Sequence, residues 1–377
     1  MTALRPTIVP NRRKRRRWPI VLGVVAAVVA VLVVASSFIT LPYYVLVPGD
    51  AVPVTNLISV PGQKPAQVLH GKILLTDVGV SQVRLINYLP DLLDSNVALV
   101  RSSALLGSAP ASEFYLQGAV DMAESQLTAK VAALRQLGYS VPETNAGAVI
   151  YQIVPGSPAW RQLVVGDVIT RVGNSPVTST AGLVAAIRAQ APGATVTLGI
   201  DNLLEHSQRT ISVRLSSAPG SPRTAFLGVY ALTQAAYAMP VGLHLSSDGI
   251  GGPSAGLAFT LGILDKLAGG DITGGKVVAA TGTMHPDGTV GPVGGVSEKT
   301  IAVERAGASV FLVPPAEFAK AEAKATPGLH VIAVSSLSQA LRALARLGGH
   351  LGRAARGPLP GPGGHSAPPG WQEAPWS

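Results

Sequence analysis

The chain has 377 residues, enough for two ordinary domains plus appendages. It contains no cysteine, which excludes disulfides, thiol catalysis and cysteine metal sites, and its seven histidines lack metal-ligand spacing. Of the formal net charge of +9, seven positive charges precede residue 18 and one net charge follows residue 347, which leaves about +1 for the body. A body so close to neutral lacks the clustered positive charge that is typical of a nucleic-acid-binding surface. We therefore predict no nucleic-acid partner, no metal and no other cofactor.

The first segments predict a membrane anchor. Residues 1–17 are a basic cytoplasmic tail in this interpretation, and residues 18–40 are apolar and long enough for one transmembrane helix. Basic flanks stay on the cytoplasmic side, so the catalytic body is expected outside the cytoplasm of a single-pass membrane protein. A cleaved signal peptide is the alternative, because Val33 and Ala35 fit a cleavage site. The length of the apolar run favours an uncleaved anchor.

Residues 41–144 combine a β-rich start with a long helix. Apolar residues recur every three or four positions over residues 113–137, which predicts a helix with one buried face. Ser112 is the expected N-cap, and Gly138 stands just past the expected end.

Residues 145–216 have a different texture. A strand ends at Pro155-Gly-Ser-Pro158, a second strand follows Gly166-Asp167, and a short helix is stopped by Pro192-Gly193. This order of strands and turns resembles a PDZ domain of the bacterial type.

The PDZ resemblance implies a groove between the first strand and the short helix. An extended peptide would add there as a strand, with its C-terminal carboxylate held by backbone N–H groups. A β-domain with a filled groove is the alternative. The residues expected to bind the peptide are Asn145, Ala146, Gly147 and Ala148.

Residues 217–347 form a second α/β body, entered through a Ser/Pro/Gly linker at 216–223. A strand predicted at 239–246 runs into a glycine-rich loop, and Ser254 follows at the start of an apolar helix. Helix N-termini favour developing negative charge, so this place suits a serine nucleophile beside an oxyanion hole. An N-capping serine is the simpler alternative. The Gly/Pro-rich residues 348–377 predict a disordered tail.

A serine nucleophile needs a base or a lowered pKa. Residues 252–256 satisfy the G-x-S-x-G pattern of α/β-hydrolases, but a loop separates the strand from the serine and the histidines are poorly placed. Lys299 is the other candidate, because burial and a helix N-terminus both lower the pKa of a lysine. On the residues alone, a lysine at this place is far more often a solvated surface side chain.

Four sequence pieces bear on this choice. In order they are Gly252-Pro-Ser-Ala-Gly256, Thr281-Gly282, Pro292 to Lys299, and Arg305-Ala-Gly307. Together they resemble the protease domain of the Lon family. The resemblance implies that Ser254 is the nucleophile, Lys299 the general base, Thr281 a hydroxyl that orients the lysine, and the backbone from Gly252 to Ala255 the oxyanion environment.

Three features depart from the Lon pattern. Many Lon enzymes have an aspartate three residues before the serine, where this chain has Gly251, and Asp248 is a candidate replacement. The usual Thr-Gly-Glu reads Thr-Gly-Thr at 281–283. The one Walker-like string, residues 270–276, is followed by Val277 and precedes its strand, so we interpret it as a turn and the enzyme as ATP-independent.

Anchor, PDZ-like module and Lon-like body together resemble bacterial membrane-anchored, PDZ-containing Lon-like serine proteases. The expected fold is α+β: a Lon-type protease domain with an inserted PDZ-like β-rich domain, preceded by one transmembrane helix. The expected function is ATP-independent endopeptidase cleavage of extracytoplasmic proteins through a Ser–Lys dyad, with the PDZ groove holding substrate tails. A homo-oligomeric ring follows from analogy alone. The alternative is a membrane-tethered PDZ scaffold whose protease-like body does not catalyse.

Overall fold

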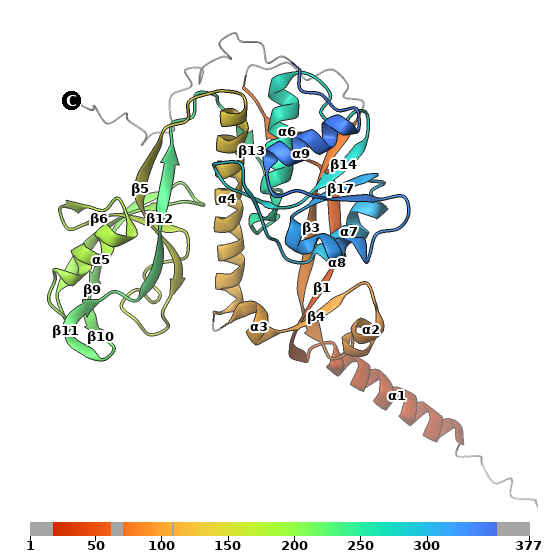
Figure 1. The fold of residues 1–377 in the computed structure, drawn as a ribbon. Coiled ribbons are helices and arrows are strands. Elements are labelled where there is room, and N and C mark those ends of the chain that lie inside the picture. The colour runs from red at the N-terminus through yellow and green to blue at the C-terminus, as the bar shows by residue number, and fades with distance from the viewer. Residues whose placement is uncertain (1–17, 62–70, 108, 353–377) are drawn as a thin grey trace, which may run out of the picture.

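The computed structural model describes residues 18–61, 71–107 and 109–352 (Figure 1). The predicted basic tail, residues 1–17, and residues 353–377 of the predicted disordered tail lie outside the described residues. The predicted extracytoplasmic location and ring assembly stay predictions.

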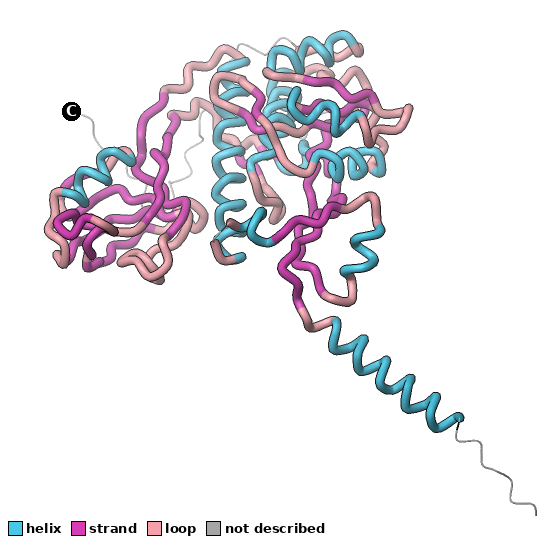
Figure 2. Tube along the Cα trace, turned by 60° about the horizontal axis from the view of Figure 1, so that its bottom comes forward, coloured by secondary structure: helices cyan, strands magenta, loops and turns pink. Residues whose placement is uncertain are grey.

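The first described element is helix α1 (Trp18–Ser36), which projects away from the rest of the chain (Figure 2). It ends at Ser36, where the chain turns and enters a strand at Thr40, so it is shorter than the apolar stretch predicted at 18–40. Among the helices of the described ranges, none is long and apolar enough to cross a membrane. The predicted transmembrane helix is therefore not supported.

A mixed six-stranded sheet forms the centre of the larger body. Its strands are β1 (Thr40–Pro53), β3 (Lys72–Arg84), β4 (Ala98–Arg101), β14 (Val277–Ala280), β17 (Val310–Val313) and β18 (His330–Ala333). The spatial order is β18-β17-β14-β3-β1-β4, and β3 runs parallel to its neighbour β14. Segments from the two ends of the chain thus build one sheet, and the predicted mixed α+β class is confirmed.

Helices cover both faces of this sheet. They are α4 (Ala111–Gln136), α6 (Gly256–Ala268), α7 (Val296–Arg305), α8 (Phe318–Glu322) and α9 (Leu337–Arg346). Successive residues of a strand point to opposite faces. Ile73 and Leu75 of β3 accordingly join the core formed with α4, α6 and α9, whereas Leu74 joins the core formed with α7 and α8. Because both faces are covered, all three side chains are buried.

A second sheet belongs to the inserted β-rich domain. The elements of this domain are β5 (Glu143–Ile153), β6 (Asp167–Val172), β7 (Ser175–Pro176), α5 (Thr180–Arg188), β8 (Thr195–Asn202), β9 (Gln208–Arg214), β10 (Ser216–Ala218), β11 (Ser221–Phe226) and β12 (Val229–Tyr237). The strand order is β12-β5-β6-β8-β9, with β7 paired to β6. The predicted linker at 216–223 is wrong, because a turn through Gly220 (φ 74°) folds it into the hairpin β10–β11.

Helix α4 stands between the two sheets (Figures 1 and 2). It begins after Pro110, so the predicted N-cap Ser112 lies inside the first turn. The short elements around the body are α2 (Tyr88–Leu93), α3 (Ser102–Leu106), β2 (Ile58–Ser59), β13 (His244–Leu245), β15 (Thr283–Met284), β16 (Val290–Gly291) and the 3-10 turns η1 (Val54–Leu57), η2 (Pro253–Ala255) and η3 (Pro315–Glu317). The strand predicted at 239–246 shrinks to β13, the part that pairs with β2.

Candidate active site

Ser254 lies in the 3-10 turn η2, directly before helix α6. The glycine-rich loop before it needs backbone conformations that favour glycine, with φ of 83° at Gly249 and 87° at Gly252. Helix α6 is buried on all sides, because Leu257, Phe259 and their apolar neighbours pack in the centre of the body. The loop therefore holds a partly exposed serine at the end of a rigid helix.

The backbone of Ser254 is fixed by residues just after strand β14. Its carbonyl oxygen accepts hydrogen bonds from the Gly282 N–H (3.0 Å) and from the Thr281 hydroxyl (3.2 Å). On the other side, the Ser125 hydroxyl of α4 donates to the Pro253 carbonyl (3.1 Å). These bonds hold the serine loop against two distant parts of the chain, helix α4 and the residues after β14.

Lys299 projects from the first turn of α7 to the Ser254 side chain. Its Nζ donates to Ser254 Oγ (2.7 Å) and to Thr281 Oγ1 (3.1 Å). The lysine is 3% exposed and Thr281 is fully buried. Ser254, Thr281 and Lys299, which the sequence places 18 to 45 residues apart, are thus brought into direct contact.

Burial sets the electrostatics of this contact. Desolvation lowers the pKa of Lys299 to about 8, against a smaller raising effect of the Asp77 and Glu317 carboxylates. Across the described residues, no carboxylate forms an ion pair with Lys299. A much larger fraction of this amine than of an ordinary lysine is therefore neutral near physiological pH and able to accept a proton.

The predicted oxyanion environment needs a correction at Gly252. Its backbone N–H donates to the Gly118 carbonyl of α4 (2.7 Å), so this donor is already engaged. Ala255 is buried at the start of α6, next to the nucleophile. The N–H groups available to an oxyanion therefore belong to the turn around Ser254 and Ala255, where a helix begins.

The acid missing at Gly251 is not replaced by Asp248. A Cβ on Gly251 would lie 3.4 Å from the Gly118 carbonyl, because α4 and the loop approach closely there. Asp248 is exposed and bonds to the Ser246 hydroxyl (2.7 Å). The carboxylates that act on Lys299 are Asp77 and Glu317, which the sequence reasoning missed. The sequence offers one indication of Asp77, because this acidic residue directly follows the residues that form the buried part of strand β3.

Ser254 and Lys299 open into a cavity of about 1110 Å³. One wall is helix α4, whose Asp121 and Glu124 have pKa values raised by burial. Asp121 accepts from the Tyr151 hydroxyl (3.5 Å) and Glu124 from the Gln234 amide (3.3 Å), both of the inserted domain. This volume can hold a segment of extended polypeptide beside the serine.

The predicted peptide-binding residues 145–148 lie on β5, an inner strand. Ala148 pairs with Thr233 of β12 on one side and with Ile169 of β6 on the other. Asn145 and Gly147 also pair with β12, so on that side the backbone has no edge left for a peptide, which argues against the predicted groove there. The edge strand next to α5 is β12, which the sequence reasoning placed outside the domain.

The described ranges hold no group of three or more side chains suited to a metal ion. The Walker-like string is a turn: Asp271 accepts hydrogen bonds from the Thr273 N–H (3.0 Å) and the Gly275 N–H (2.7 Å). The segment then leads into β14, as its interpretation as a turn requires.

Comparisons with known proteins match two separate parts of the chain. Residues 136–215 match the PDZ domain model, and residues 232–346 match the model of the Lon protease (S16) C-terminal proteolytic domain. The Lon protease of Chloroflexus aggregans is 36% identical over 99 residues, which cover 25% of this chain and 12% of that protein. Lon protease 2 of Bacillus subtilis is 34% identical over 102 residues, which cover 26% of this chain and 18% of that protein. The matches thus span less than a fifth of either relative.

Among solved structures, the PDZ domain of the SdrC-like protein from Listeria monocytogenes is 19% identical. The match covers 23% of this chain and 87% of that one, with a TM-score of 0.21. The PDZ domain of the SdrC-like protein from Listeria innocua is 20% identical. That match covers 22% of this chain and 92% of that one, and it has the same TM-score. From the matched family models, the chain carries a PDZ domain and a Lon protease C-terminal proteolytic domain.

Proposed function

We propose that this protein is a serine endopeptidase that uses Ser254 and Lys299 as a catalytic dyad. The observation that carries the proposal is the 2.7 Å contact between Lys299 Nζ and Ser254 Oγ inside a Lon-type domain. A serine with a normal pKa is a weak nucleophile, and an adjacent base activates it. Lys299 suits this role because its pKa of about 8 lies close to neutral pH, so the amine can both accept and return a proton.

In the first half of the reaction, neutral Lys299 takes the proton of Ser254 while Oγ attacks the peptide carbonyl carbon. The carbonyl oxygen becomes an oxyanion, which the N–H groups at the start of α6 and the positive end of that helix stabilise. The ammonium of Lys299 then gives its proton to the leaving amine as the C–N bond breaks. An acyl-enzyme on Ser254 remains.

In the second half, water attacks the ester carbonyl and gives its proton to Lys299. The lysine returns the proton to Ser254 Oγ as the acyl group leaves as a carboxylic acid. Thr281 keeps the amine aimed, because its hydroxyl accepts from Lys299 and donates to the Ser254 carbonyl. No step of this hydrolysis consumes a nucleotide, and the proposed cleavage is ATP-independent.

The PDZ domain is proposed to hold extended segments of the substrate along β12. An edge strand offers unpaired backbone groups to a peptide, and β12 lies beside α5. Apolar side chains are exposed on both elements: Tyr230, Leu232 and Val184. This places the peptide strand opposite the side of β12 that pairs with β5.

Replacement of each dyad residue in the full chain tests the proposal. Ser254→Ala and Lys299→Ala should each reduce cleavage of reduced, unfolded casein by at least about 10³-fold. Two exposed residues give matched controls, Ser212→Ala and Lys320→Ala, which should cleave at the parent rate. Parent activity in either dyad variant would end the proposal.

The same variants separate the enzyme from a PDZ scaffold with an inert protease-like body. A fluorophosphonate reacts covalently with an activated serine. The enzyme should be modified at Ser254, read by peptide mass spectrometry, and Ser254→Ala should not be. A scaffold would show no modification there.

A further inference from the structure

The PDZ domain also reaches the cavity that contains Ser254. The turn between β8 and β9 lines this cavity with Leu203, Leu204 and His206. Ser254 and Lys299 line the same cavity, so side chains of the PDZ domain and of the dyad face one continuous space. This surface differs from the edge strand β12.

Apolar packing holds the turn against helix α4. Val120 of α4 shares a buried cluster with Val149, Val165 and Val168 of the PDZ domain, and Leu116, Leu203 and Leu204 pack against it. Gly166 marks the tightness of this approach, because a Cβ there would lie 3.2 Å from Val120 and 3.5 Å from Leu204. The turn is therefore fixed relative to the wall of the cavity.

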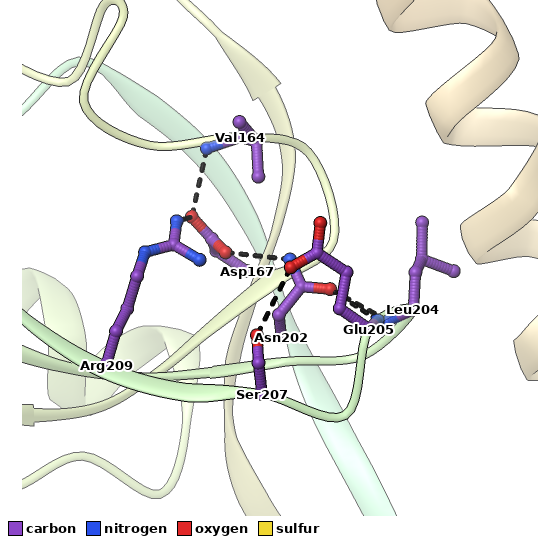
Figure 3. Close-up of polar contacts among 7 residues, drawn as sticks. All are labelled: Val164, Asp167, Asn202, Leu204, Glu205, Ser207 and Arg209. Carbon is purple, nitrogen blue, oxygen red and sulfur yellow. Dashed lines mark hydrogen bonds and ion pairs between the residues drawn. The ribbon is translucent and has the colours of Figure 1, made fainter.

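A buried polar network sets the shape of the turn (Figure 3). Asp167, fully buried, accepts from the Val164 N–H (2.9 Å) and the Asn202 amide (2.9 Å), and Arg209 forms an ion pair with it. The Asn202 Oδ1 in turn accepts from the N–H groups of Leu204 (3.0 Å) and Glu205 (2.8 Å). Asn202 thereby ties the backbone of the turn to the buried aspartate.

We propose that the β8–β9 turn of the PDZ domain is a wall of the catalytic cleft. Leu204 contacts the substrate, an extended polypeptide with an apolar side chain at this point, and determines specificity there. Asp167 and Asn202 are positioning residues, which act by holding Leu204 in place. This inference rests on the proposed function, and it gives the PDZ domain a second role apart from capture along β12.

Kinetics on the full chain test it with matched pairs. Leu204→Ser removes the proposed substrate contact, and Asn202→Ala removes the hydrogen bonds that hold Leu204 in place. The exposed Leu89→Ser and Asn174→Ala are the respective controls. We expect KM for unfolded casein to rise about fivefold to tenfold in both cleft variants, with kcat within twofold. Modification of Ser254 by a small fluorophosphonate, which does not need the polypeptide cleft, should keep the parent rate. Both controls should behave as the parent.

The absence of cysteine gives a second measurement that is independent of cleavage. In a Ser254→Ala background, Leu204→Cys carrying a benzophenone maleimide should cross-link bound casein on illumination, and Leu89→Cys should not. This reads contact directly, so it also decides the matter where Leu204→Ser folds poorly.

The outcomes are distinguishable. Unchanged KM in both cleft variants, or no cross-link from position 204, overturns the inference while the proposed function stands. An equal fall of Ser254 modification and casein cleavage in Leu204→Ser also overturns it, because the turn would then support the dyad and not the substrate. A parent chain that neither cleaves casein nor reacts at Ser254 overturns the proposed function and the inference with it.

Discussion

Two buried ionisable side chains, one in each domain, differ in the partners that surround them. Asp167 of the PDZ domain is fully buried and is met by Arg209, the Asn202 amide and the Val164 N–H (Figure 3). Lys299 of the Lon-type domain is 3% exposed, and its amine donates hydrogen bonds to two hydroxyl groups.

The difference lies in whether the buried charge is compensated. A carboxylate with an ion pair and hydrogen bonds stays in place as a charge and stabilises a particular turn. A lysine without an ion pair avoids the cost of burial by losing its proton, and its pKa falls to about 8. The compensated charge of Asp167 therefore stabilises the structure of the PDZ domain. The uncompensated amine of Lys299 instead loses its proton more readily and can act as a base.

The largest expected effect is on activity, from Lys299→Met. Methionine keeps an unbranched chain of similar length without an amine, so cleavage of casein should fall by at least about 10³-fold. The melting temperature at pH 7 should be equal or higher, because the variant no longer pays for burying an ammonium group. Activity assays and thermal unfolding on one preparation measure both, and a lower melting temperature with retained activity would reverse the assignment.

Asp167→Ala should show the opposite pattern. Removing one partner of a buried ion pair leaves the Asn202 amide and the Val164 N–H without an acceptor, at a cost of about 3–5 kcal/mol. The exposed Glu205→Ala, in the same turn, should cost less than about 0.5 kcal/mol. Denaturant unfolding gives both values. Fluorophosphonate modification of Ser254 should survive in Asp167→Ala under native conditions, and its loss there would contradict the separation of the two roles.

Thr281 should have a smaller effect on activity. Thr281→Val keeps the shape and removes the hydroxyl that bonds Lys299 and the Ser254 carbonyl, so kcat/KM should fall roughly 30-fold, near the worth of two hydrogen bonds at about 1 kcal/mol each. Thr281→Ser retains the hydroxyl and should recover most of the parent value. Equal losses in both variants would point to packing of the threonine methyl instead.

The smallest expected change is a shift in pH dependence from Asp77→Asn. The Asp77 carboxylate raises the pKa of Lys299, so its neutral replacement should lower that pKa further. Activity that needs the neutral amine rises as pH passes through this pKa, and the rising limb should therefore move to lower pH. Asp50→Asn, an exposed neighbour, is the control and should leave the kcat/KM profile in place. A shift of the limb to higher pH in Asp77→Asn would refute the electrostatic account.

Local patterns of the sequence predict several elements close to their observed positions. Periodic apolar residues over 113–137 correspond to α4, and the short helix predicted before Pro192-Gly193 corresponds to α5. Proximity of Ser254, Thr281 and Lys299 had no such local basis, and it was anticipated by resemblance alone. Their contact depends on β14 bringing Thr281 beside the start of α6, which is a tertiary arrangement.

The misses have a common cause in strand pairing. Nothing in residues 145–148 reveals that β12, some 85 residues later, pairs along them, so the peptide groove was placed on an inner strand. Asp77 acts on Lys299 because helix α7 packs on the face of the sheet that contains β3. Gly252 loses its oxyanion role because α4 offers a carbonyl at Gly118. Each of these facts depends on a residue that is distant in the sequence and close in the folded structure.

The pH dependence of Ser254 modification tests the central claim most directly. The rate of fluorophosphonate reaction should be measured from about pH 6 to about pH 11, in the parent and in Lys299→Met. If neutral Lys299 activates Ser254, the parent rate rises through a single limb near pH 8 and the variant is slow at every pH. Equal rates in both proteins, or a parent limb near the ordinary lysine pKa of 10.5, would contradict the account.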